Sequence, residues 1–215
     1  MNVLIDNLPQ LLRGFRTTIA LSASAAVIAI VLGVLLAAIR VSPVPTLRWA
    51  GAFYVNTIRN TPLTLVYAFL AFGVPRLDFQ VGPFRAAAIA LGLYTAAFIC
   101  EAVRSGVNAV PVGQAEAARS IGLTFTGTLR HVVLAQAIRS VIPPLGSILI
   151  AMVKNSAIAE FFAVAEATKV FDDLVRDNPQ ELYWLFFGVA LGYVLLVLAI
   201  SGVFRFLESR LVVLR

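Results

Sequence analysis

The sequence predicts an all-α, polytopic membrane protein with five membrane-spanning helices. Hydrophobic residues make up 60% of its 215 residues and charged residues only 13%, with a mean hydropathy of +0.91. Soluble domains are about a quarter charged, so this balance indicates a chain whose outer faces are solvated by lipid. The charge-free run at 17–39 would form a helix of roughly 34 Å, which is long enough to cross a bilayer.

Five apolar runs have the length of a span. They cover residues 17–39, 53–73, 84–103, 141–163 and 182–204. The second is disturbed near its start by "RNTP" (59–62), and the fourth begins at Pro143 and Pro144. Proline is tolerated where it opens a helix or kinks a packed one. Residues 40–49 are expected to form a short, proline-broken turn, and 104–140 a long connection.

The distribution of Lys and Arg predicts the orientation in the membrane, because cytoplasmic loops are enriched in both. With the N-terminus outside and the C-terminus in the cytoplasm, nine of these residues lie inside and six outside. The inner set is Arg40, Arg48, Arg104, Arg119, Arg130, Arg139, Arg205, Arg210 and Arg215, and the outer set is Arg13, Arg16, Arg76, Arg85, Lys169 and Arg176. We therefore expect an outer interfacial segment at 1–16, a transmembrane domain at 17–207 with 104–140 in the cytoplasm, and a cytoplasmic tail at 208–215.

Several function classes have no support in the sequence. The net charge of +6 is scattered at the ends of apolar runs, which is typical of topology determinants and not of nucleic-acid binding. The single cysteine, Cys100, and the single histidine, His131, are too few for a disulfide or a zinc site. No Walker A, Gly-x-Ser-x-Gly or His-Glu-x-x-His motif is present. We expect no enzyme activity and no cofactor in this chain, although a membrane-embedded enzyme, a channel and a secondary transporter remain alternatives.

The stretch "GQAEAARSIG" (113–122) is small, charged and prone to form a helix, which is unusual in so apolar a chain. Gly122 suits the left-handed end of such a helix. The alanines keep it thin, and Glu116 and Arg119 are spaced to pair on its exposed face. From these residues alone it is either an ordinary cytoplasmic connector or an element that docks into a partner's groove.

The residues that follow this stretch resemble those of a known family. "EAARSIG" is followed by "LTFTGTLRHVVLAQAIRSVIPPL", which is similar to the signature loop of permease subunits of ABC importers for polar amino acids. "RNTPLTLV" (59–66), "FICEAVRSG" (98–106) and "KNSAIAEFFAVAE" (154–166) resemble other segments of that family. Asn60, Val66 and Ala157 depart from its usual pattern. The run "NTPLTLV" looks most like glutamate-type permeases of actinobacteria.

The resemblance implies a type I importer permease in the cell membrane of a bacterium. Its substrates would be polar amino acids, with glutamate or glutamine expected. The stretch at 114–122 would be a cytoplasmic coupling helix that docks into a separate ATP-binding cassette ATPase dimer, which would bind ATP and Mg. Its residues are Gln114, Glu116, Ala117, Ala118, Arg119 and Gly122. Further expected partners are a second permease subunit, identical or homologous, and an extracytoplasmic substrate-binding protein.

Polar residues within the spans are candidates for the substrate path, because such groups normally face protein or a wet cavity. Seven residues form this set: Lys154, Asn155, Ser156, Arg59, Asn60, Thr61 and Glu101. Lys154 either attracts a substrate carboxylate or is a structural lysine that pairs with Glu160 or with an acidic residue of another chain. Arg59, Asn60 and Thr61 either line the path or break the helix, as the family resemblance implies, or Arg59 simply extends its charge toward the interface. For Glu101, an ion pair with Arg104 is favoured over substrate contact.

Two further patterns concern packing. Gly92 and Ala96 form a small-xxx-small face that is expected to make close helix contacts. Residues 164–182 carry apolar side chains at helical intervals among acidic ones. They predict an amphipathic helix on the outer surface, beside the place where the family resemblance puts the substrate-binding protein.

Overall fold

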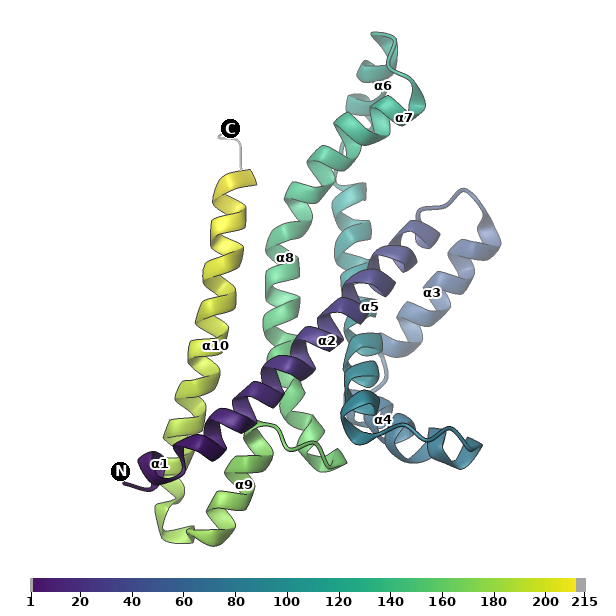
Figure 1. The fold of residues 1–215 in the computed structure, drawn as a ribbon. Coiled ribbons are helices and arrows are strands. Elements are labelled where there is room, and N and C mark those ends of the chain that lie inside the picture. Colours follow the sequence, from purple (N-terminus) through teal and green to yellow (C-terminus); the bar gives the residue numbers. More distant parts are fainter. Residues whose placement is uncertain (1, 212–215) are drawn as a thin grey trace.

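The computed structural model describes residues 2–211, and its regular elements are all helical over that range (Figure 1). The α-helices are α1 (Asn2–Asp6), α2 (Leu8–Arg40), α3 (Pro45–Arg59), α4 (Leu63–Ala68), α5 (Pro83–Asn108), α6 (Val112–Ser120), α7 (Phe125–Thr128), α8 (Leu134–Asn155), α9 (Ala167–Asp177) and α10 (Leu182–Leu211). Two π-helical segments, η1 (Phe69–Gly73) and η3 (Leu129–Val133), and three 3₁₀ segments, η2 (Val74–Leu77), η4 (Ser156–Phe162) and η5 (Pro179–Glu181), extend or connect them. The all-α prediction is confirmed.

Small residues let α2 cross closely over α5 (Figure 1). A Cβ atom added to Gly33 would lie 2.7 Å from the side chain of Ile99, and one added to Gly92 would lie 2.8 Å from Ile28. Ala96 is fully buried at the same contact. The predicted small-residue face is therefore a contact between two helices of one chain, where close backbone approach replaces the hydrophobic effect as the source of attraction.

The second predicted span, 53–73, is not one continuous helix. α3 begins at Pro45, inside the predicted turn, and ends at Arg59. The chain then bends through 60–62 before α4 begins at Leu63. Pro62 explains the break, because it donates no backbone hydrogen bond and disfavours helical geometry in the residue before it. Among residues 2–211, four helical segments are long and apolar enough to cross a membrane, and Leu63–Leu77 is a shorter apolar one.

The fourth predicted span also differs at both ends. α8 begins at Leu134, so Pro143 and Pro144 lie inside the helix and do not open it. The α-helical part ends at Asn155, and η4 continues it in tighter 3₁₀ geometry to Phe162. The family resemblance and the apolar pattern indicated the segment correctly, but they did not reveal that its N-terminal part extends from η3 beyond the apolar run.

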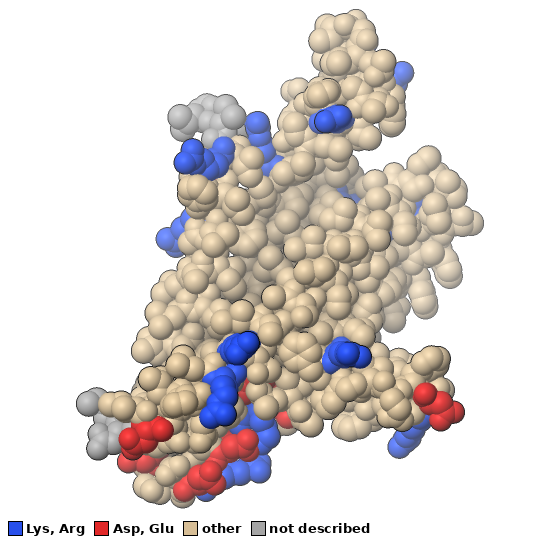
Figure 2. Space-filling model, viewed as in Figure 1, with Lys and Arg blue, Asp and Glu red and all other residues tan. Residues whose placement is uncertain are grey.

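α1 and the last turns of α10 lie at opposite ends of the molecule (Figure 1). α1, the first turns of α2, α9 and the start of α10 pack together around Leu11, Leu174 and Leu185. α6 and α7 project at the other end, beyond the last turns of α10 (Figure 1). On the face in Figure 2, acidic side chains gather near α9, whereas the end with α6 shows only basic ones.

The expected flanking segments are largely helical. α2 begins at Leu8 and runs without a break through the expected boundary at 16 and 17. At the other end, α10 continues to Leu211, so the first part of the expected tail 208–215 is helical and residues 212–215 lie outside the described part of the chain.

Candidate functional site

The stretch at 113–122 forms a separate short helix, α6, at the projecting end of the molecule. Pro111 precedes it in extended geometry, and Gly122 follows it with φ +93. The amide of Gly122 donates to the carbonyl of Arg119 at 3.0 Å, and that of Leu123 donates to Ala118 at 3.1 Å. These bonds satisfy carbonyls at the helix end, and the left-handed conformation that permits them favours glycine.

Most residues of α6 are exposed in the part of the chain that the structure describes. Only Ala118 is buried, while Gln114, Glu116 and Arg119 are exposed. The large apolar side chains at its two ends, Val112 and Ile121, are 73% and 81% exposed. The predicted pair of Glu116 and Arg119 does not form, since no ion pair joins them in the part of the chain that the structure describes. A thin helix with free charges at its centre and exposed apolar ends is typical of a docking element.

Three arginines surround the carboxylate of Glu101 where α2, α3 and α5 meet. Arg104 Nη2 lies 2.9 Å from Oε2, and this confirms the predicted local ion pair. Arg40, at the end of α2, is bound to Oε1, and Arg59 Nη1 lies 4.0 Å from the same oxygen. The sequence did not indicate the contact between Arg40 and Glu101, because the two residues are 61 positions apart. One carboxylate and three guanidiniums leave a local excess of positive charge.

Arg59 also connects this cluster to a groove between α5 and α8 that is lined by apolar and a few polar side chains. Its guanidinium lies 5.4 Å from the centre of the Phe98 ring, a cation–π distance. Phe98 lines a groove of about 240 Å³ together with Tyr94, Thr95 and Asn155. The structure therefore brings three of the predicted path residues, Arg59, Glu101 and Asn155, to one region of the molecule.

The remaining predicted path residues lie apart from the groove lining. Asn60 and Thr61 donate side-chain hydrogen bonds to the carbonyls of Asn56 and Thr57, at 2.7 and 2.8 Å, and so cap the end of α3. Ser156 is buried and donates to the Val153 carbonyl at 2.7 Å. These three side chains satisfy backbone groups where regular helix ends.

Lys154 is exposed near the end of α8. Within residues 2–211 it makes no ion pair, so the alternative in which it pairs with Glu160 inside one subunit is wrong. An exposed ammonium beside the groove residue Asn155 remains available to a ligand or to another chain.

A second polar network, which sequence reasoning missed, is centred on Glu166. This glutamate is fully buried and caps α9 by accepting a hydrogen bond from the Lys169 amide at 2.9 Å. Its other oxygen accepts from Tyr193 of α10 at 2.8 Å and from Thr18 of α2 at 3.2 Å. The only signal in the sequence was an acidic residue directly before a helical pattern, which is a common cap.

The predicted amphipathic helix at 164–182 is confirmed as the shorter α9. Its apolar residues pack toward α2 and α10, and its charged residues face outward. Arg176 Nη2 lies 2.9 Å from Asp172 Oδ2, and Lys169 bonds to Asp173. The hydrogen bond to Asp173 raises the pKa of Lys169 above its ordinary value.

Several known proteins are similar to this chain in sequence or in structure. The family profile described as "binding-protein-dependent transport system inner membrane component" matches residues 8–213. The glutamate transport system permease protein GluC of Corynebacterium efficiens is 41% identical over 202 residues, which cover 88% of this chain and 89% of that protein. The probable glutamine ABC transporter permease protein GlnM of Bacillus subtilis is 39% identical over 98% of this chain and 97% of that protein. A solved crystal structure of an amino acid ABC transporter with histidines matches with a TM-score of 0.88 and 28% identity, covering 96% of each chain.

Proposed function

The chain belongs to the family of binding-protein-dependent transport system inner membrane components, and from this premise we propose that it imports polar amino acids, with glutamate or glutamine as the substrate. Its relatives of 39–41% identity are named for the transport of these two amino acids. The observation that carries the proposal is α6, a short helix that projects from the bundle with its surface free to dock.

ATP hydrolysis is assigned to a partner. The docking residues are Gln114, Glu116, Ala117, Ala118, Arg119 and Gly122, and they would bind one subunit of an ATP-binding cassette ATPase dimer, which holds ATP and Mg. Exposed Val112 and Ile121 flank the charged centre of this surface and add apolar area that association would remove from water. Closure of the two ATPases would move α6, and α7, η3 and α8 would carry the motion to the span.

A second permease subunit, identical or homologous, would complete the path. The groove on α5 and α8 is partly open, and its lining includes the polar residues Thr95 and Asn155. We place the translocation path along this face, with Arg59, Glu101, Lys154 and Asn155 facing it or close to it. Asn60, Thr61 and Ser156 act there by shaping the breaks at the ends of α3 and α8.

The proposed topology has five crossings. α3 and the segment from α4 to η2 together form the second one, interrupted at 60–62. The N-terminus, residues 1–16 and α9 lie outside, where a substrate-binding protein would dock, and the C-terminal tail lies in the cytoplasm. This orientation puts the basic end of the molecule in Figure 2 on the cytoplasmic side.

The local charge favours an anionic group in the path. The cluster at Glu101 has two more cations than anions, and Lys154 is a further exposed cation on α8, next in sequence to the groove residue Asn155. In a low-dielectric site this excess attracts a carboxylate more strongly than a neutral amide. Glutamate is therefore the favoured member of the pair.

The test is reconstitution of the permease with its ATPase and binding protein in proteoliposomes. ATP-dependent uptake of labelled glutamate is expected, and Glu116→Lys is expected to abolish it together with membrane retention of the ATPase. Glu208→Lys, which reverses an acidic charge elsewhere at the same end of the molecule, is the matched control and should keep both. Uptake by the permease alone, driven by an ion gradient, would instead establish a secondary transporter.

A further inference from the structure

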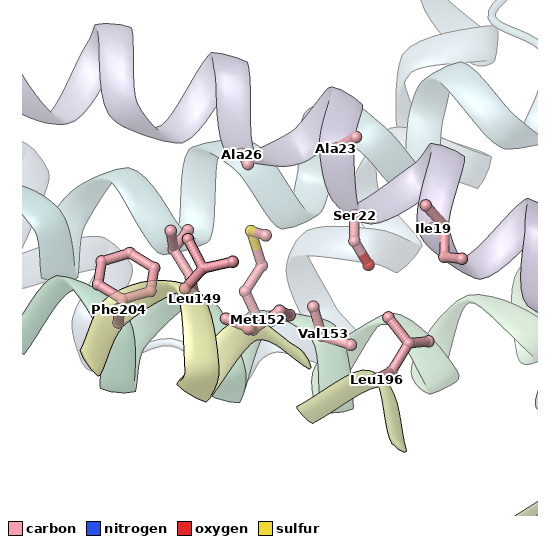
Figure 3. A pocket seen from close by; sticks show the side chains of 11 residues that line it. Ile19, Ser22, Ala23, Ala26, Leu149, Met152, Val153, Leu196 and Phe204 are labelled. Carbon is pink, nitrogen blue, oxygen red and sulfur yellow. The ribbon is translucent and has the colours of Figure 1, made fainter. Parts of the chain in front are cut away.

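α2, α8 and α10 line an open apolar slot of about 310 Å³ (Figure 3). Its walls include Ile19 and Ala23 of α2, Val153 of α8, and Leu196 and Phe204 of α10. Even an apolar cavity of about 150 Å³ stays dry and takes up small apolar molecules. A slot of this size between membrane spans would be filled by an apolar group and not by water.

The slot and the groove lie on neighbouring faces of α8 and share Met152. Leu149 and Val153, four residues apart, line only the slot, whereas Ile148, Ala151 and Asn155 line only the groove. α10, which forms one wall of the slot, exposes large apolar side chains along its length. The α10 side of the slot therefore borders a surface suited to lipid.

Ser22 contributes an unpaired hydroxyl to the slot. Its side chain is 6% exposed, and its Oγ has no hydrogen-bond partner among residues 2–211. Figure 3 shows this hydroxyl directed away from α2 into the space above Val153. Thr18 and Ser24 of the same helix donate to the carbonyl four residues earlier, and Ser22 does not. A buried hydroxyl without a hydrogen-bond partner is unfavourable in hydrocarbon. A bound molecule that supplies an acceptor for the Ser22 hydroxyl would therefore stabilise this site.

A cation precedes the slot residues on the same face of α2. Arg16 precedes Ile19 and Ala23 by three and seven residues, so the three share one stripe of α2. Arg16 is exposed and makes no ion pair in the described part of the chain. It lies about 9 Å along the helix axis from Ser22, on the side of the N-terminus. From Arg16 onward, the face therefore offers a cation, a hydrogen-bond donor and an apolar slot.

We propose that this face binds a glycerophospholipid whose headgroup lies at the end of α2 that carries Arg16, which rests on the membrane location proposed above. The Arg16 guanidinium pairs with the phosphate, the Ser22 hydroxyl donates to an ester carbonyl, and one acyl chain lies in the slot along α10. Leu196 and Phe204 are eight residues apart, so the slot extends for about 12 Å. This length is less than half of a hydrocarbon core about 30 Å thick. The bound chain would fill the space that separates α10 from α2 and α8.

Photo-crosslinking of the full chain in membranes tests the proposal. The probe is phosphatidylglycerol that carries a diazirine in one acyl chain, and labelled peptides are mapped by mass spectrometry. Label is expected on residues 149–153 and 196–204. Ala23→Phe should fill the slot and lower this labelling roughly fivefold or more, as should the loss of the polar contacts in Ser22→Ala with Arg16→Gln. Ala20→Phe adds the same bulk on an exposed part of α2 outside the slot, so it should leave labelling unchanged.

Three results would overturn the proposal. Equal labelling of wild type and Ala23→Phe would show that no acyl chain occupies the slot. Inorganic phosphate can also be tested as a competitor that lowers labelling by the lipid probe. If its effect requires Arg16 but is the same in wild type and Ala23→Phe, the face holds an anion site only. A disulfide between two copies of a Leu196→Cys variant, in a Cys100→Ala background, would show that a second subunit covers the slot in place of lipid.

Discussion

The hydroxyl of Tyr193 donates a hydrogen bond of 2.8 Å to the buried carboxylate of Glu166. The same carboxylate caps α9 and accepts from Thr18, so one side chain joins α2, α9 and α10. No cation pairs with it among residues 2–211. Its burial is offset by hydrogen bonds alone, which makes the loss of any donor costly.

Tyr193→Phe is expected to destabilise the protein by about 1–3 kcal/mol, because it leaves one oxygen of a buried carboxylate with fewer donors. The measurement is thermal unfolding in detergent. Tyr183→Phe is a matched control, since this tyrosine is exposed at the start of α10. Equal stability of the two variants would show that Glu166 does not depend on Tyr193.

Gly122→Ala is expected to weaken retention of the ATPase and to lower uptake. The residue has φ +93, and a non-glycine residue in a left-handed conformation costs roughly 1–2 kcal/mol. Gly113→Ala is the control, because an added Cβ atom has open space there too and no left-handed conformation is required. ATPase activity that cosediments with membranes measures the effect, and equal losses in both variants would contradict it.

Lys154→Met is expected to lower glutamate uptake roughly tenfold and to leave glutamine uptake much less affected, because a charge-assisted contact is worth about 1.5–3 kcal/mol. Competition between the two labelled substrates gives the ratio. An unchanged ratio would exclude a role in recognition. Since Lys154 does not pair with Glu160, adding Glu160→Gln should not restore uptake.

Glu101→Gln is expected to reduce the amount of folded protein, because three guanidiniums would then repel one another around a neutral amide. Adding Arg40→Gln should recover part of the loss, and a double-mutant cycle measured by thermal unfolding gives the coupling. Arg48→Gln is the control, since Arg48 bonds only to backbone carbonyls of the turn before α3. Additive effects of Glu101→Gln and Arg40→Gln would contradict the cluster.

The topology predicts opposite labelling of two exposed positions. In a Cys100→Ala background, Asp173→Cys on α9 should react with an impermeant thiol reagent in intact cells. Thr126→Cys on α7 should react only after the membrane is opened. The reverse pattern would invert the orientation, and it would leave the fold of the bundle unchanged.

The sequence by itself determined the class of protein and the position of most helices. Composition and long apolar runs reflect the lipid solvent directly, so they predicted an all-helical membrane protein whatever its packing. Local chemistry also located α6, because proline before a short helix and glycine after it act within a few residues. The family resemblance rested on the same contiguous motifs.

Only the tertiary structure decided how distant residues meet. Hydropathy gave one span at 53–73, but Pro62 and the capping by Asn60 and Thr61 broke it into two helices. The contacts of Arg40 with Glu101 and of Thr18 with Glu166 join residues 61 and 148 positions apart. Periodicity describes which face of a helix is apolar and not which helix that face meets. Buried polar partners of this kind are therefore fixed by packing, where a low dielectric makes each unpaired group costly.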